Sequence, residues 1–212
     1  MAPTVLSLLV PPVFVGAHTV RAFLAKEYNV EAVVRSEKSG KEVLGTHPEY
    51  KDRLYTTIVA DITDSKAYEA ALEGVDGISL IEEIFLLVSH TNRDQVIHTA
   101  SPIWLETSDY NKELFQPAID GTTAVPKAVK NSKANINRVV ITSSVSYILE
   151  LLKELNPGKN YTESDWNPVI REDATKGNSI IAYLASKALA ENAAWEFVKE
   201  HSVSKIATVD TR

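Results

Sequence analysis

A tyrosine and a lysine lie four residues apart in the segment Tyr183-Leu-Ala-Ser-Lys187. Residues at this spacing share one face of a helix, and the absence of glycine and proline between Ile180 and His201 predicts a helix here. A cation beside a phenol favours the phenolate and lowers the pKa of the tyrosine. Tyr183 is therefore a candidate proton donor to a carbonyl oxygen. Such pairs are also common on solvated helix faces, so the pair alone leaves both interpretations open.

The elements that must position this helix are apolar strands that end in small polar residues. Residues 138–144 read Arg-Val-Val-Ile-Thr-Ser-Ser, and residues 96–102 read Val-Ile-His-Thr-Ala-Ser-Pro. At the start of the chain, a strand over 5–10, a helix over 17–27 and a strand over 30–34 predict a βαβ unit. We therefore predict an α/β fold, with a doubly wound (Rossmann) parallel sheet and helices on both faces.

Composition narrows the class of protein. The 212 residues suit one domain spanning 1–212, and a net charge of -6 argues against nucleic acid or an anionic membrane as partner. With no cysteine and five histidines that lack ligand spacing, we predict no metal site. The apolar run at 5–17 lacks a preceding basic residue and contains two prolines, so we do not expect a signal peptide. A cytoplasmic protein is the expectation.

These motifs together resemble the extended short-chain dehydrogenase/reductase family, also named the NAD-dependent epimerase/dehydratase family. Within it, the similarity is to dihydroflavonol-reductase-like and methylglyoxal-reductase-like aldehyde/ketone reductases. The matching segments, in the order in which that family carries them, are Arg35-Ser36, Asp61-Ile62, residues 98–102, residues 117–122 (Pro-Ala-Ile-Asp-Gly-Thr), residues 142–144, Trp166-Asn-Pro168, Tyr183 to Lys187 and residues 193–197.

The resemblance implies three catalytic residues. Tyr183 would protonate the carbonyl oxygen, and Lys187 would tune that phenol and bind the nicotinamide ribose. Ser144 would donate a hydrogen bond to the same carbonyl oxygen, with Ser143 as the fallback. The hydride would come from the cofactor.

The resemblance also implies a set of cofactor-binding residues. A cation at position 35, where NAD-binding relatives carry an acidic residue, favours NADPH over NADH. For Lys38 a solvated charged loop is an equally good interpretation. The implied cofactor-binding residues are Phe14, Val15, Gly16, Arg35, Lys38, Asp61, Ile62, Thr99, Ala100, Ser101, Tyr183 and Lys187.

The chain departs from the family pattern in three places. The turn expected to be glycine-rich reads Val10-Pro-Pro-Val-Phe-Val-Gly16, in which two prolines lack N–H donors; a local frameshift in the gene is our hypothesis for it. Residues 78–95 form an atypical insertion, for which a retained intron and a genuine insertion both stay open. The chain ends within a predicted sixth strand at Arg212, so we expect the C-terminal substrate lobe of the family to be missing from it.

The prediction is an NADPH-dependent oxidoreductase that reduces an aldehyde or ketone to an alcohol. The alternative is a non-catalytic Rossmann domain, a pseudoenzyme or interaction module, which the altered glycine turn and missing lobe favour; an epimerase or dehydratase on this scaffold is a third. The expected partner is a small carbonyl substrate. A homodimer formed through the helices at 114–130 and 181–199 is a further expectation from the resemblance.

Overall fold

The computed structural model describes residues 4–8, 14–73, 75, 95–98, 107–134, 136, 138–148, 158–162, 164–168, 170–201 and 206–209. The strands are β1 (Thr4–Leu8), β2 (Asn29–Val34), β3 (Leu54–Ile58), β4 (Gln95–His98), β5 (Arg138–Thr142) and β6 (Ile206–Val209). The helices are α1 (Phe14–Ala25), α2 (Glu37–Thr46), η1 (Pro48–Tyr50), α3 (Ser65–Ala71), η2 (Asn111–Phe115), α5 (Gln116–Asn131), η3 (Val145–Tyr147), α6 (Arg171–Lys176) and α7 (Ser179–His201).

The six strands form one parallel sheet in the order β3-β2-β1-β4-β5-β6. Leu6 of β1 lies between Glu31 of β2 and Val96 of β4, so the strand order reverses direction at β1. Parallel strands are covered on both faces and therefore read as apolar runs, and in β5 both Val139 and Val140 are fully buried. The observed order is that of the doubly wound fold, which confirms the predicted fold class.

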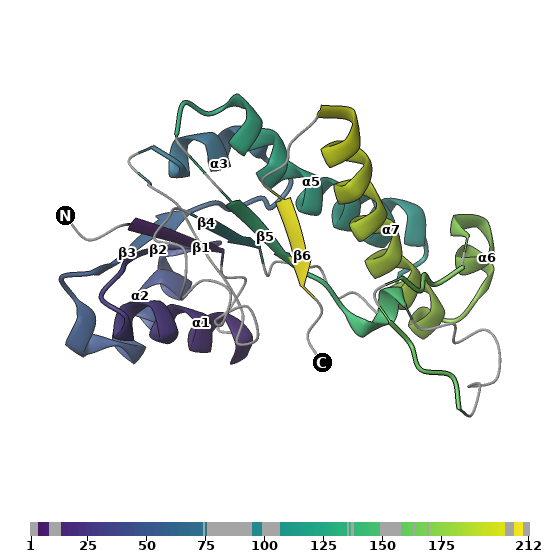
Figure 1. The fold of residues 1–212 in the computed structure, drawn as a ribbon, viewed down its shortest axis with the longest axis horizontal. Helices are drawn as coiled ribbons and strands as arrows, with labels where there is room; N and C mark the ends of the chain where they lie inside the picture. The colour runs from purple at the N-terminus through teal and green to yellow at the C-terminus, as the bar shows by residue number, and fades with distance from the viewer. Residues whose placement is uncertain are drawn as a thin grey trace.

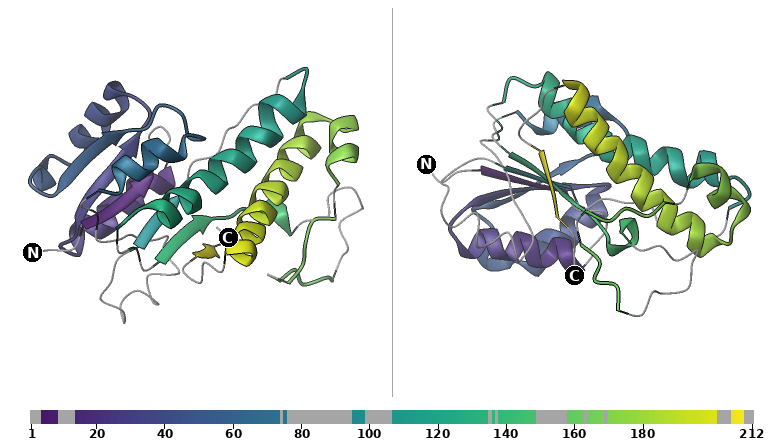
Figure 2. Two further views of the ribbon diagram at one scale, coloured as in Figure 1. Left: turned by 90° about the horizontal axis from the view of Figure 1, so that it is seen from above. Right: turned by 45° about the vertical axis from the view of Figure 1, so that its right-hand side comes forward.

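Helices cover both faces of the sheet (Figure 1). Helices α1 and α2 lie on one face, and α3 and α5 lie on the other. Helix α7 runs alongside α5 in both views of Figure 2 and extends beyond the sheet toward α6. Packing against α5 places α7 beside the carboxyl end of β5.

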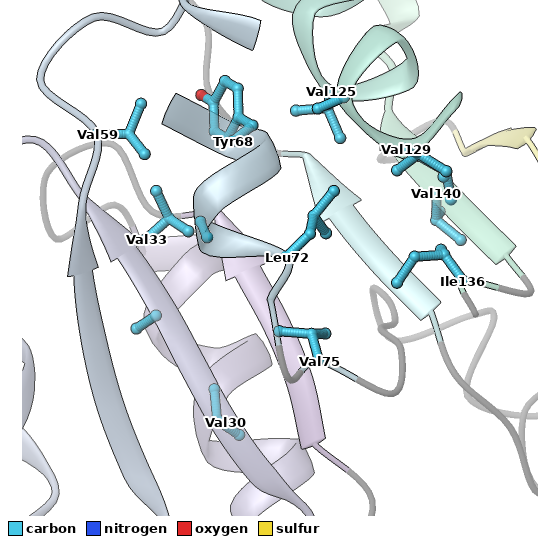
Figure 3. Close-up of a cluster of buried hydrophobic side chains, with 14 of the residues drawn as sticks. Val30, Val33, Val59, Tyr68, Leu72, Val75, Val125, Val129, Ile136 and Val140 are labelled. Atoms are coloured by element: carbon cyan, nitrogen blue, oxygen red, sulfur yellow. The ribbon is translucent and has the colours of Figure 1, made fainter. Parts of the chain in front are cut away.

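The main core lies against both faces of the sheet, with buried side chains of α1 and α2 on one face and of α3, α5 and α7 on the other. Figure 3 shows Tyr68 of α3 and Leu72, directly after α3, near Val125 of α5. All three are almost completely buried. Burial of side chains of this size contributes about 1.5 to 3 kcal/mol each, so this layer holds the helices on the sheet.

A glycine in α5 brings the loop after β3 close to that helix. A Cβ placed on Gly121 would lie 2.9 Å from Cδ1 of Ile62. Because carbon atoms do not approach this closely, the missing side chain provides the space that Ile62 occupies.

The elements differ from the predictions in a few places. Helix α2 was not predicted; Ser36 caps it by accepting a hydrogen bond from the Ser39 amide at 3.3 Å. The short helix α6 was not predicted either. Residues 10–13 and 78–94 lie outside the described residues, whereas Gln95, predicted to end the insertion, begins β4.

Candidate active site

The predicted site residues that are described gather along one edge of the sheet. Helix α1 begins at Phe14 after β1, Arg35 directly follows β2, and Asp61 follows β3. Ser144 comes two residues after the end of β5. Since all strands are parallel, these positions share the carboxyl edge, where open α/β sheets bind ligands beside the point at which the strand order reverses.

Tyr183 and Lys187 lie one turn apart on α7, as predicted. The Nζ atom of Lys187 lies 4.7 Å from the centroid of the Tyr183 ring, within the range of a cation–π contact. Both side chains are half-buried. The alternative interpretation, in which the pair lies on a solvated helix face, is therefore wrong.

The predicted lowering of the Tyr183 pKa is wrong in this structure. Burial raises the pKa of Tyr183 above its ordinary value, because a phenolate loses solvation when it is removed from water. Burial also lowers the pKa of Lys187 to about 8. The ammonium contacts the face of the ring, and the phenol stays protonated at neutral pH, which is the state that a proton donor needs.

The segment after Ser144 packs directly against α7. Ala188, the residue after Lys187, is buried in a cluster with Tyr147 and Ile148. The Ser144 hydroxyl donates to Oγ of Ser146 at 2.9 Å. Ser144 therefore lies in a short turn held against the part of the helix that carries Tyr183 and Lys187.

A second loop closes over this turn. The Asn167 side-chain amide donates to the carbonyl oxygen of Ser146 at 3.2 Å, and the Asn167 backbone N–H donates to the carbonyl oxygen of Tyr147. Trp166 meets the Tyr147 ring edge-on, with ring centroids 5.1 Å apart. Trp166 and Asn167 thus hold the turn that follows Ser144.

The residues predicted for the adenosine end lie on the β3-β2-β1 half of the edge. Gly16 is buried in the first turn of α1, whose first residues are Phe14 and Val15. Arg35 is exposed, and its guanidinium pairs with no acidic side chain of the described residues. Lys38 is 87% exposed and lies 4.0 Å from Glu42, one helical turn along α2.

Asp61 and Ile62 have contacts of their own. Oδ1 of Asp61 accepts hydrogen bonds at 2.8 Å from the backbone N–H and the hydroxyl of Thr63. The first of these bonds is the main reason that the Asp61 pKa is lowered. Ile62 packs against Gly121 of α5. Contact of either residue with an adenine stays a prediction.

Some predictions concern residues that the structure does not describe, namely Thr99, Ala100 and Ser101. In the part of the chain that is described, no cluster of three or more His, Cys, Asp or Glu side chains could hold a metal ion. Over the same residues, no helix has the length and apolar character needed to span a membrane.

The model of the NAD dependent epimerase/dehydratase family matches residues 13–209 of the chain. The chain belongs to this family. Several known oxidoreductases are similar to this chain. An uncharacterized oxidoreductase of Schizosaccharomyces pombe is 36% identical over 193 residues, which are 90% of this chain and 52% of that protein. The NADPH-dependent methylglyoxal reductase GRE2 of Saccharomyces cerevisiae is 29% identical over 194 residues, covering 89% of this chain and 51% of the relative.

Solved structures similar to this chain have the same fold. The crystal structure of Gre2 from Candida albicans in complex with NADPH is 33% identical, with a TM-score of 0.79. The match covers 98% of this chain and 56% of that one. The chain therefore spans about half the length of the relatives that it matches.

One buried carboxylate beside the candidate site was not predicted from the sequence. Glu191 is 5% exposed and accepts a hydrogen bond from the Ser143 hydroxyl, 48 residues away in the sequence. Its only local signal is position, because Tyr183, Lys187 and Glu191 recur at intervals of four along α7.

Proposed function

We propose that this protein is an NADPH-dependent oxidoreductase that reduces an aldehyde or ketone to an alcohol. The observation that carries the proposal is the half-buried pair on α7, with the Lys187 ammonium 4.7 Å from the Tyr183 ring centre. Ala188, the residue after Lys187, packs against Tyr147 and Ile148, which follow Ser144 in the chain. The relatives named as reductases support the assignment, and none of them favours the non-catalytic alternative.

Two features at the carboxyl edge of the sheet support binding of a dinucleotide that carries a 2′-phosphate. The first turn of α1 is the kind of helix N-terminus that attracts phosphate, and its residue Gly16 is buried against the fold. Arg35 places an exposed cation directly after β2, where a 2′-phosphate would be recognised. NADPH, when bound, would supply the hydride.

The residues of the chain would supply the proton and the charge stabilisation. The Tyr183 hydroxyl, kept protonated by burial, would donate its proton to the carbonyl oxygen. Lys187, with a pKa of about 8, is predominantly charged at neutral pH, so it would stabilise the phenolate left behind.

Ser144 is the better of the two candidate serines. The Ser143 hydroxyl has a single hydrogen, and it donates that hydrogen to Glu191. The Ser144 hydroxyl donates to Ser146, a neutral oxygen. Turning the Ser144 hydroxyl toward a substrate carbonyl gives up a neutral hydrogen bond, which is weaker than a bond to a carboxylate.

Titration of the purified protein with NADPH and with NADH, followed by fluorescence or calorimetry, tests the cofactor assignment. We expect NADPH to bind more tightly, and we expect Arg35→Ala to weaken NADPH binding about 10- to 100-fold because a charged hydrogen bond contributes about 1.5 to 3 kcal/mol. NADH binding should change little.

Lys51→Ala is the charge-matched control for Arg35→Ala. Lys51 is exposed and precedes β3, so it lies at the opposite edge of the sheet. Equal losses in both variants would show a general charge effect and contradict a specific phosphate contact at Arg35. A folded wild-type protein that binds neither nucleotide would contradict the proposed function.

A further inference from the structure

Glu191 is an acidic side chain that the proposed reaction does not use. It is 5% exposed, although burying a carboxylate is costly unless hydrogen bonds compensate for the lost water. An apolar residue would pack at this position of α7 without that cost. The presence of the carboxylate therefore calls for a role beyond packing.

The two carboxylate oxygens of Glu191 contact two different parts of the molecule. Oε2 accepts the hydrogen bond from the Ser143 hydroxyl at the carboxyl end of β5. Oε1 accepts one from Nε1 of Trp195, one turn further along α7, at 3.3 Å. The side chain thus ties the sheet to the helix, and the Trp195 bond holds the carboxylate in its orientation.

This tie connects the two segments that carry the groups that must meet at the substrate. Ser143 is bonded through the backbone to Ser144, and Glu191 lies two helical turns from Tyr183 and one from Lys187. Helix α7 and the end of β5 are separate elements, so the distance between Ser144 and Tyr183 depends on what connects them. The apolar contact of Ala188 with Tyr147 and Ile148 also joins them. The hydrogen bond from Ser143 to Glu191 adds a contact with a preferred geometry, which restricts how the two elements can shift.

We propose that Glu191 is a positioning residue that holds the Ser143–Ser144 segment in register with Tyr183 and Lys187. This inference rests on the proposed reductase function. Its effect is on geometry: the hydroxyl of Ser144 and the phenol of Tyr183 would reach the same carbonyl oxygen only while the tie is intact. Misplacement of such groups by about 1 Å can cost about 100-fold in rate.

A double-mutant cycle on turnover distinguishes positioning from general stability. We expect Glu191→Ala to lower kcat about 10- to 100-fold, while the Kd for NADPH changes less than about threefold. In the Ser144→Ala background, Glu191→Ala should lower kcat by less than about threefold, because the hydroxyl that it positions is already gone. Glu191→Gln keeps one acceptor and should retain an intermediate kcat.

Glu196→Ala is the matched control, since Glu196 is an exposed glutamate on the same helix, and it should leave kcat unchanged. If Glu191→Ala multiplies the loss of Ser144→Ala by its full factor, Glu191 does not act through Ser144 and the proposal is overturned. If Glu191→Ala does not fold, Ser143→Ala breaks the same tie from the other side and should give the same kcat loss and the same non-additivity.

If the proposed function itself is wrong, the folded wild-type protein will neither bind NADPH nor oxidise it in the presence of a carbonyl substrate. The tie is then judged by thermal unfolding of Ser143→Ala, Glu191→Gln and the double variant. A double variant with the same melting temperature as the less stable single variant supports the tie. Additive decreases in melting temperature overturn it.

Discussion

Replacing Lys187 by methionine should stabilise the protein at neutral pH and change how its stability depends on pH. Burial lowers the pKa of Lys187 from its ordinary value of 10.5 to about 8. The folded protein therefore holds this ammonium less readily than the unfolded chain does. Methionine has a similar length and no charge, so Lys187→Met removes this cost while filling the same space.

The magnitude follows from the displaced pKa. Each pKa unit corresponds to about 1.4 kcal/mol, so the charged lysine costs about 3 kcal/mol at pH 7, where it is protonated in both states. Between the folded pKa of about 8 and the unfolded value, the unfolded chain binds more protons, so stability rises with pH. We expect the wild type to gain about 2 kcal/mol relative to Lys187→Met between pH 7 and pH 9.5.

Urea unfolding at intervals across that range measures the difference between the two proteins. The upper limit matters because the raised pKa of Tyr183 acts in the opposite direction above its ordinary value of 10. Lys199→Met, at an exposed lysine of the same helix, should show a difference from wild type that does not vary with pH. A constant difference between wild type and Lys187→Met would refute the reasoning that burial shifts this lysine.

Two further predictions concern the elements around the site. Ser36→Ala should lower the free energy of unfolding by about 1 kcal/mol through loss of the α2 cap, and Ser36→Gly by only a few tenths; equal losses in urea unfolding would contradict a capping role. Gly121→Val should lower it by about 1 to 3 kcal/mol by overpacking against Ile62. Adding Ile62→Ala should recover part of that loss in thermal unfolding, and a purely additive result would contradict the contact.

Much of the sheet could be predicted because its strands are short β-branched runs. Val139 and Val140 face opposite sides and are both buried, so no polar residue interrupts the pattern of β5. Helix α2 could not be predicted in the same way, since it contains two glycines and few apolar residues. A Cβ placed on Gly40 would lie 3.3 Å from the Thr56 hydroxyl oxygen of β3, a close approach that depends on the tertiary fold.

In the site, too, features that depend on neighbouring residues in the sequence could be predicted, and features that depend on the tertiary fold could not. Tyr183 and Lys187 were predictable because their spacing is local and helical. The direction of the Tyr183 pKa was not, since it depends on how much of the phenol the rest of the fold covers. The role of Glu191 depends on Ser143, and only the folded sheet brings these two residues together.

Oxidation of NADPH in the presence of methylglyoxal, by the wild type and by Tyr183→Phe, tests the central proposal most directly. The wild type should consume NADPH. Tyr183→Phe should bind NADPH with similar affinity and turn over at least about 100-fold more slowly, because general acid catalysis contributes about 10²- to 10⁴-fold. Equal rates in the two proteins would contradict the role of Tyr183 as the proton donor.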